Sequence, residues 1–226
     1  MSTPADIALP TAQIEIWSDI ACPWCYIGKR RFADTLAAFP QRDRIVVTWR
    51  SYQLAPDTPA GLKKPEIEAL VEMKGMPADQ VRQMFSQVSA TAAQVGLDID
   101  FDTVIAANTF DAHRLLHLAG DKRDELLEAL FRAHFVGGAI VDDREALVRI
   151  AVSVGLDADQ IRADLDSDAA ADAVRATSSK PGSWVSRECR SSSPTARSRC
   201  RVPRRRTCFS HCWNARFPTQ TAPSPS

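Results

Sequence analysis

Apolar and polar residues alternate over residues 13–18 (QIEIWS), which is the period of two expected for a β-strand with one buried face. Residues 44–52 (RIVVTWRSY) are rich in β-branched and aromatic side chains and predict a second strand. Between them, residues 23–38 place apolar side chains at helical spacing, with Pro23 in a first turn and Pro40 ending the pattern. The three segments predict a β-α-β unit.

The pattern changes to a helical period over residues 65–165, where apolar pairs such as Leu70-Val71 and Leu126-Leu127 recur. Glycines such as Gly96 and Gly120 separate the runs. This block predicts four or five helices, and a further short helix is predicted at residues 159–176. No internal repeat is evident.

Residues 183–226 follow no period and are dominated by Ser, Arg, Pro, Thr and Cys, a composition that predicts disorder. They hold nine Arg and one acid, which leaves 19 basic and 27 acidic residues of the chain's 28 and 28 in residues 1–182. The net charge of zero therefore divides into −8 for the body and +8 for the tail.

The composition fits one domain, or one domain with a large insertion, because the 226 residues are 45% hydrophobic and 25% charged. The longest apolar runs, such as Ile45-Val46-Val47, are far shorter than a bilayer span. The first residues do not join a basic n-region to an apolar h-region. We therefore expect a cytoplasmic protein without a membrane partner.

The run Cys22-Pro23-Trp24-Cys25 follows the first predicted strand and opens the first predicted helix. Two intervening residues in a helical first turn bring two sulfurs within bridging distance. The free N–H groups and the dipole of the helix N-terminus favour a thiolate at the first cysteine. We therefore predict Cys22 as the catalytic nucleophile and Cys25 as the catalytic resolving thiol, with Pro23 and Trp24 shaping the site.

Two other interpretations of the cysteine pair are a zinc half-site and a pair of buried structural thiols. Zinc needs further ligands at suitable spacing, and the other cysteines all lie in the tail, at Cys189, Cys200, Cys208 and Cys212, with His211 among them. We therefore predict no metal and no organic cofactor.

Several segments together resemble the cytoplasmic DsbA-like proteins of the FrnE type, over roughly residues 13–176. The resemblance implies an α/β, thioredoxin-like fold with a large all-helical insertion. It implies disulfide oxidase, reductase or isomerase chemistry on protein or small-molecule thiols and disulfides, with glutathione as a redox partner. The matching segments are Ile16–Lys29, Ser51–Pro56, Asn108–Leu115, His134–Gly138 and Asp143–Glu145.

This resemblance divides the chain into four parts. A thioredoxin-like β-α-β part is expected at residues 13–58, a helical insertion at 59–165, a return helix at 166–182 and a basic tail at 183–226. The 2-hydroxychromene-2-carboxylate isomerases and kappa-class glutathione transferases resemble the same architecture but usually carry Ser at the first redox position. Cys22 and Cys25 favour dithiol chemistry, and a glutathione-dependent isomerase or transferase is the alternative.

Three further positions have local interpretations. Asn108-Thr109 is expected to begin a helix and cap its free N–H groups. His113 and His117 are four residues apart and lack a third metal ligand, so we expect a polar helix face, and the family resemblance implies a place for His113 near the mouth of the active site. Asp19 is expected to be a turn residue that starts the first helix, although its carboxylate also suits a proton acceptor for a thiol.

The sequence departs from the family after residue 176. The resemblance implies two more strands, a closing helix and a Gly-Val-Pro loop that faces the redox pair, and residues 177–226 contain none of them. Shifting the frame over Trp184 to Phe217, with free choice of synonymous codons, permits a translation with these elements in order. We interpret the tail as a frameshift, which predicts a chain that is poorly folded or inactive. The alternative is an authentic basic tail that binds nucleic acid or a membrane through its Arg cluster; the frameshift hypothesis expects neither partner.

Overall fold

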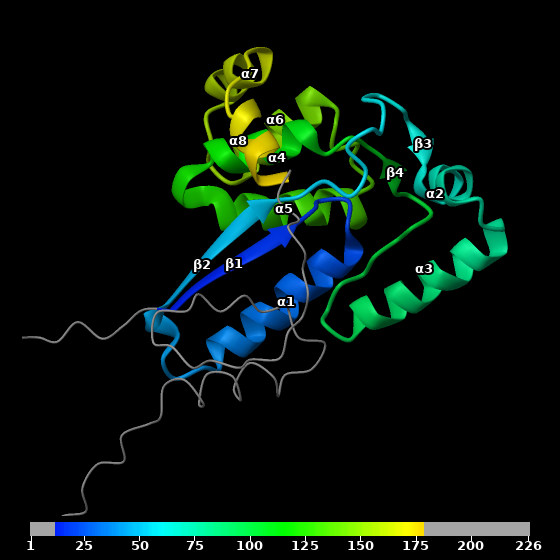
Figure 1. Cartoon of the computed structure of the whole chain (residues 1–226), viewed down its shortest axis with the longest axis horizontal. Coiled ribbons are helices and arrows are strands. Elements are labelled where there is room, and N and C mark those ends of the chain that lie inside the picture. Colours follow the sequence, from blue (N-terminus) through cyan, green and yellow to red (C-terminus); the bar gives the residue numbers. More distant parts are fainter. Residues whose placement is uncertain (1–11, 179–226) are drawn as a thin grey trace, which may run out of the picture.

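A computed structural model describes residues 12–178 and begins with the predicted β-α-β unit. Its elements are β1 (Ala12–Ser18), α1 (Pro23–Ala37) and β2 (Ile45–Ser51), with a short 3₁₀ turn, η1 (Arg42–Arg44), before the second strand. The two strands are parallel, in register from Ala12 opposite Ile45 to Ser18 opposite Ser51. Parallel neighbours require a crossover, and α1 provides it alongside the strands in Figure 1.

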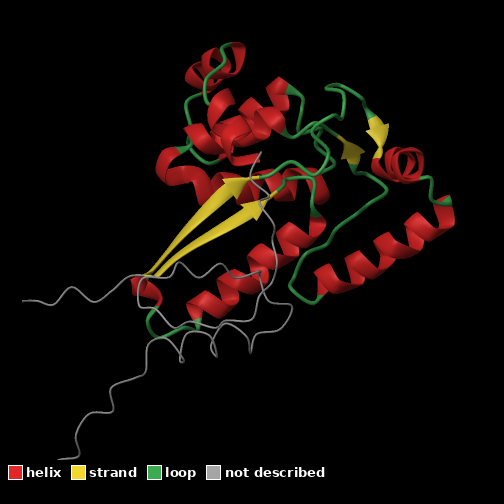
Figure 2. Cartoon of the chain, viewed as in Figure 1, coloured by secondary structure: helices red, strands yellow, loops and turns green. Residues whose placement is uncertain are grey.

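Helices make up most of the remaining chain, as Figure 2 shows. Five helices lie wholly within residues 65–165, which confirms the predicted helical block. They are α2 (Glu66–Lys74), α3 (Ala78–Ala93), α4 (Phe110–Leu118), α5 (Arg123–Phe135) and α6 (Arg144–Ser153), with a 3₁₀ turn η2 (Gly120–Lys122) between α4 and α5.

The prediction of one short helix at residues 159–176 is wrong, because two helices occupy that stretch. These are α7 (Ala158–Asp166) and α8 (Ala171–Ser178). Ala170 between them has a φ of 60°, a left-handed conformation that a right-handed helix does not continue through. A left-handed alanine has no sequence signature, so the pattern did not reveal the break.

A second small sheet was not predicted. It pairs β3 (Lys64–Pro65) with β4 (Ile105–Ala106) in antiparallel register, with Lys64 opposite Ala106. Two-residue strands are too short to show alternation. In Figure 1 this sheet and α2 and α3 lie at the right, and α7 lies at the top.

The core joins α1 to the helical block through aromatic and aliphatic side chains. Tyr26 of α1 stacks on Phe131 of α5 with a ring-centroid separation of 4.9 Å. Phe101, in the loop before β4, stacks on Phe85 of α3 at 3.9 Å. Because each buried aromatic ring contributes a large apolar area, these stacks fix α1 and therefore the Cys22 end of that helix.

The carboxyl ends of β1 and β2 point toward the start of α1, which is where ligand sites collect in α/β sheets. Within residues 12–178 no helix is long and apolar enough to span a membrane. β1 has β2 as its one strand neighbour there. The predicted tail, the missing strands and helix and the frameshift concern residues outside those described, and the boundaries at residues 58, 165 and 182 stay predictions.

Candidate active site

Cys22 is the N-cap residue of α1, and three residues separate it from the end of β1. Its backbone is extended, with φ −101° and ψ 106°, and Pro23 occupies the first turn of the helix. The Cys22 N–H donates to the carbonyl of Asp19 at 3.1 Å, and the Cys22 carbonyl accepts from the N–H of Cys25 at 3.0 Å. The pair therefore lies at a helix N-terminus, as the sequence predicted.

The two cysteines are unbridged thiols in different surroundings. Both are half-buried, and Cys25 packs against the hydrophobic core. Pro23 is half-buried, while Trp24 has 53% of its surface exposed beside the pair. Of the two sulfurs, Cys25 is therefore the one packed against the core, which suits a resolving thiol.

The thiols share a hydrogen bond that separates their ionisations. That bond, followed by burial and the charge of Cys25, raises the pKa of Cys22 above its usual range. The same bond lowers the pKa of Cys25 to about 7, against the effect of burial, with help from the Asp19 backbone and the Ser18 hydroxyl. The prediction of a lowered pKa at Cys22 is therefore wrong, because the shared hydrogen bond lowers the pKa of Cys25 and raises that of Cys22. The two thiols ionise as a pair, so the pair loses its first proton at a lower pH than an ordinary thiol does.

Asp19 lies buried beneath the turn that leads into Cys22. Its Oδ2 accepts from the Leu54 N–H at 2.6 Å, and its Oδ1 accepts from the Ala21 N–H at 3.3 Å. His113 Nε2 lies 3.3 Å from the same Oδ1. Burial raises the pKa of Asp19, but His113, the Leu54 N–H and Thr109 outweigh it, so the pKa lies below its usual range. Asp19 therefore stays ionised and fastens three segments together.

Asn108 connects the loop after β2 to the start of α4. Its side-chain nitrogen donates to the carbonyl of Thr58 at 2.6 Å, and its side-chain oxygen accepts from the N–H of Phe110 at 2.9 Å. The second bond satisfies a free N–H at the start of α4, as predicted, although Thr109 is the N-cap residue and its side chain makes no capping bond. The loop after β2 is thus held against α4 beside the cysteine pair.

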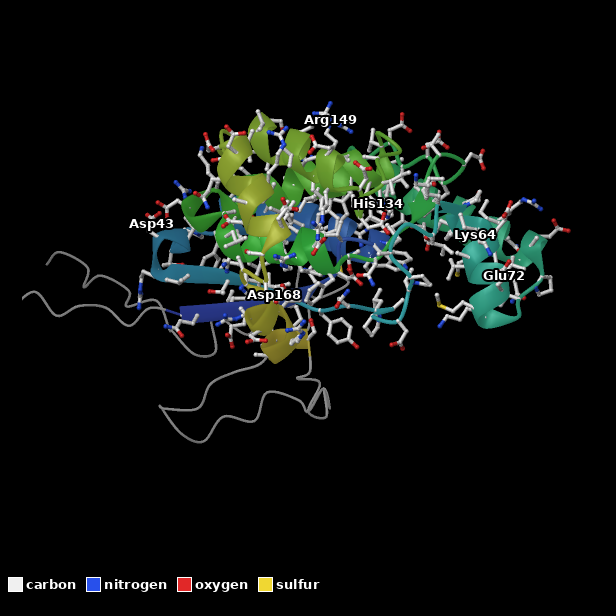
Figure 3. The ribbon with its side chains drawn as sticks, turned by 90° about the horizontal axis from the view of Figure 1, so that it is seen from above. Asp43, Lys64, Glu72, His134, Arg149 and Asp168 are labelled. Atoms are coloured by element: carbon white, nitrogen blue, oxygen red, sulfur yellow. The ribbon has the colours of Figure 1, made fainter. Side chains whose placement is uncertain are left out.

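Two more ionisable groups lie within electrostatic reach of Asp19. Burial, and then the charge of Asp19, raises the pKa of Glu66 in α2 to about 7. Burial lowers the pKa of His134 in α5 to about 4, although the Ala139 backbone and the carboxylates of Asp19 and Asp142 act in the other direction. In Figure 3 His134 lies among interior side chains, whereas Lys64 and Glu72 lie side by side at one edge.

The two histidines of α4 face different partners. His113 is fully buried against Asp19, so the prediction of a polar face is wrong for it. His117 is half-buried, and its Nε2 lies 3.1 Å from the Ser51 hydroxyl. No cluster of three or more His, Cys, Asp or Glu side chains suited to a metal ion occurs within residues 12–178.

Sequence reasoning found the cysteines but missed most of what surrounds them. Ser18, Glu66 and His134 received no role, Asp19 received a local one, and His113 was expected near the site only through the family resemblance. The available signal was the position of Ser18 and Asp19 at the carboxyl end of a strand, immediately before the cysteine turn. No sequence pattern indicated the contacts that α2, α4 and α5 make around the site, because these contacts join residues far apart in the chain.

Comparison with known proteins gives a consistent family. Residues 13–180 match the model for the DSBA-like thioredoxin domain. The uncharacterized protein YwbO of Bacillus subtilis (strain 168) is 26% identical over 160 residues, covering 70% of this chain and 73% of that protein. A probable DsbA oxidoreductase of Streptomyces coelicolor superposes with a TM-score of 0.70 at 43% identity, covering 73% of this chain and 72% of the other.

More distant structures share the fold. A putative protein disulfide isomerase from Nitrosomonas europaea gives a TM-score of 0.53, covering 74% of this chain and 76% of that chain. A 2-hydroxychromene-2-carboxylate isomerase gives 0.54, covering 74% and 77%. Each is 15% identical, so these two likenesses concern the fold alone. The fold is the DsbA-like thioredoxin fold, mixed α/β with many helices, as predicted.

Proposed function

This chain belongs to the DsbA-like thioredoxin domain family, and from that premise we propose that it is a thiol–disulfide oxidoreductase acting through Cys22 and Cys25. One observation carries the proposal: two unbridged, half-buried thiols lie at the N-terminus of α1, and the second packs against the hydrophobic core. An eased first ionisation supplies the thiolate that disulfide exchange requires near neutral pH.

The exchange proceeds in two displacements. The Cys22 thiolate attacks one sulfur of a substrate disulfide, which forms a mixed disulfide and releases the other substrate sulfur as a thiolate. Cys25 then loses its proton to that leaving thiolate or to solvent and attacks the Cys22 sulfur. This forms the Cys22–Cys25 disulfide and releases the second substrate sulfur. The substrate gains two electrons and the protein loses two, and the same steps in reverse oxidise a dithiol.

The substrates we propose are polypeptides or small molecules that carry a disulfide or a thiol pair. Trp24 is 53% exposed and Leu54, whose N–H binds Asp19, is 58% exposed, so two large apolar side chains flank the turn of the pair. Such a surface suits an apolar segment of a partly unfolded chain. We further propose glutathione as the redox partner, no resident cofactor, and a cytoplasmic site of action.

The test is disulfide reduction by the full chain, with glutathione as the reductant and a protein disulfide as the substrate. Cys22→Ala should abolish turnover, and Cys25→Ala should abolish turnover while trapping a mixed disulfide on Cys22. A matched control replaces the four tail cysteines Cys189, Cys200, Cys208 and Cys212 with Ala and should keep the activity. Turnover that survives both active-site variants would contradict the proposal.

The same variants separate the alternatives. A glutathione-dependent isomerase or transferase would need one activated thiol, so its activity would survive Cys25→Ala. An inactive frameshifted product would show no exchange in the full chain, whereas an in-frame repair of residues 183–226 would restore it. Resequencing the coding DNA around codons 176–190 decides which protein the assay should use.

A further inference from the structure

The loop between β2 and β3, residues 52–63, has no helix or strand of its own. Loops of this length without secondary structure are uncommon in compact domains unless they serve a function. Most of its exposed side chains are apolar, namely Leu54, Pro56, Pro59 and Ala60, against the charged Asp57 and Lys63. The 52–63 loop therefore presents an apolar surface to solvent, which is typical of a recognition surface.

The first part of this loop is attached to the turn that carries Cys22. The N–H of Leu54 donates to Oδ2 of Asp19 at 2.6 Å, and the N–H of Cys22 donates to the carbonyl of Asp19 at 3.1 Å. The N–H of Tyr52 donates to the carbonyl of Ser18 at 3.1 Å. Leu54 and Cys22 are thus each one hydrogen bond from the same residue, and Leu54 keeps 58% of its surface exposed there.

Asn108 holds the middle of the loop with every hydrogen-bonding position of its side chain. Its amide nitrogen donates to the carbonyls of Thr58 at 2.6 Å and Pro56 at 3.3 Å. Its amide oxygen accepts from the side chain of Gln53 at 3.3 Å and from the N–H of Phe110 at 2.9 Å. An asparagine side chain offers two donors and two acceptor positions, so Asn108 is fully engaged, mostly with the loop.

Asp142 holds the far part of the loop, and Asn108 with it, through a single oxygen. Its Oδ2 accepts from the N–H of Gly61 at 2.8 Å and from the N–H of Asn108 at 3.2 Å. Between these attachments Pro56 and Pro59 fix their own φ angles and stiffen the chain. The conformation of the loop is therefore set in advance by two residues that lie outside it.

We propose that Asn108 and Asp142 are positioning residues for substrate recognition: they hold the 52–63 loop as a fixed apolar rim beside Cys22, and this rim binds the apolar polypeptide segment next to a substrate disulfide. This inference rests on the proposed function and names the substrate class of that same site. A flexible loop loses conformational entropy when a polypeptide docks on it, whereas a loop already fixed in its bound shape does not.

The occupant of the rim follows from the reaction. In the mixed disulfide the substrate cysteine is bonded to the Cys22 sulfur, so the residues on either side of that cysteine are held near the rim at a high effective concentration. A polypeptide brings such residues, whereas a small disulfide brings almost no apolar surface. The rim therefore favours protein and peptide disulfides over small ones.

The experiment compares two disulfides on the full chain, with glutathione as the electron donor. One is a peptide with apolar residues around an intramolecular disulfide, and the other is bis(2-hydroxyethyl) disulfide. Asn108→Asp keeps the oxygen that accepts from Phe110 at the start of α4 but loses both donors to the loop. It should raise the apparent KM for the peptide about tenfold with little change in kcat, and affect the small disulfide much less.

Two further positions test the two ends of the argument. Asp142→Ala frees the N–H groups of Gly61 and Asn108 and should raise the KM for the peptide in the same way, whereas Asp142→Asn keeps an acceptor oxygen and should largely restore the parent KM. Leu54→Ala removes an exposed apolar side chain of the rim itself and should also raise the KM for the peptide severalfold.

Matched controls lie on other elements. Asp157→Ala removes the N-cap of α7, which accepts from the N–H of Gln160 at 2.8 Å, so it loses a helix cap without touching the loop. Val152→Ala trims a side chain of α6 that is 46% exposed. Both should show wild-type kinetics on the two disulfides.

A second readout follows binding without exchange. The fluorescence anisotropy of a labelled apolar peptide that contains no cysteine should show weaker binding to Asn108→Asp and Leu54→Ala than to wild type. Losses of equal size on both disulfides would overturn the proposal, because the residues would then act on the thiols, and so would equal peptide binding by wild type and both variants. If binding weakens as expected but no variant, wild type included, exchanges a disulfide, the proposed function fails while the recognition role stands.

Discussion

Oδ1 of Asp19 lies 3.3 Å from Nε2 of His113, and their side chains are 3% and 1% exposed. The two residues are 94 positions apart and join the turn before Cys22 to helix α4. A buried carboxylate is costly unless it is paired and hydrogen-bonded, and here His113 and two backbone N–H groups satisfy it. This contact holds the cysteine pair against the helical block.

Removal of this carboxylate should destabilise the whole fold. We expect Asp19→Ala to lower the free energy of unfolding by about 3 kcal/mol, because it leaves His113 and the Leu54 N–H buried without an acceptor. Urea unfolding followed by circular dichroism measures this change. Asp98→Ala removes an exposed carboxylate and should stay within about 0.5 kcal/mol of wild type. Equal effects of the two variants would contradict the role of Asp19.

The same residue should also affect thiol ionisation. The negative charge of Asp19 raises the pKa of both cysteines, so Asp19→Asn, which keeps the shape and removes the charge, should let the pair ionise at lower pH. The rate of iodoacetamide labelling of Cys22 and Cys25 against pH measures this. A profile displaced to higher pH would show that Asp19 acts through structure rather than charge.

The parts of the fold that could be predicted from sequence are those in which local patterns decide the structure. Alternation over residues 13–18 gave β1, and Pro23 with Cys22 marked the start of α1, because each pattern lies within one element. The break at Ala170 was missed, since a left-handed alanine has no sequence signature. β3 and β4 were missed because two residues show no period.

The candidate site likewise combines residues that are adjacent in sequence with residues from distant elements. Cys22, Pro23, Trp24 and Cys25 are adjacent in sequence, so the place of this segment at the start of a helix could be predicted. The environment of the pair is built by residues on separate elements, and a single sequence contains no record of such pairings. His113 shows the consequence, because its spacing from His117 suggested a shared polar face while its true neighbour is Asp19.

His134 should make the protein less stable in acid. Its pKa is about 4 in the fold, mainly through burial, and about 6.5 when unfolded. Between these values the unfolded chain binds a proton that the folded chain does not. The free energy of unfolding should therefore fall by about 3 kcal/mol as pH drops from 6.5 to 4. Urea titrations at stepped pH measure how the free energy of unfolding changes with pH. His134→Leu should remove this part of the pH dependence, and an unchanged dependence would contradict the role of His134.

Glu66 should act in the opposite direction over nearly the same range. Burial, and then Asp19, raises its folded pKa to about 7, whereas the unfolded value is about 4.3. Between these two pKa values the folded chain keeps a proton that the unfolded chain has lost. The contribution of Glu66 to the free energy of unfolding is therefore fully present below the unfolded pKa and is lost as pH rises through 7. In wild type the free energy of unfolding should fall by at most about 3 kcal/mol between pH 4.5 and 7 for this reason, and Glu66→Gln should abolish that fall. Comparison with His134→Leu separates the two opposing slopes.

Arg114 should be irreplaceable by lysine. Its guanidinium is buried and donates to the carbonyls of Ala169, Leu165 and Asp164 at 2.9, 3.3 and 2.7 Å, and it pairs with Asp111 at 2.7 Å. It thereby satisfies the carboxyl end of α7 at the break before α8.

Lysine supplies a single ammonium in place of this planar group, so Arg114→Lys leaves several carbonyls unsatisfied and should cost about 3 kcal/mol or more in the free energy of unfolding. The matched change Arg175→Lys alters an exposed arginine paired with Asp172 at 2.9 Å and should cost less than about 1 kcal/mol. Urea unfolding of the two variants side by side measures the difference. Equal stabilities would mean that the end of α7 is held by packing alone, since the exposed pair contributes little in either form.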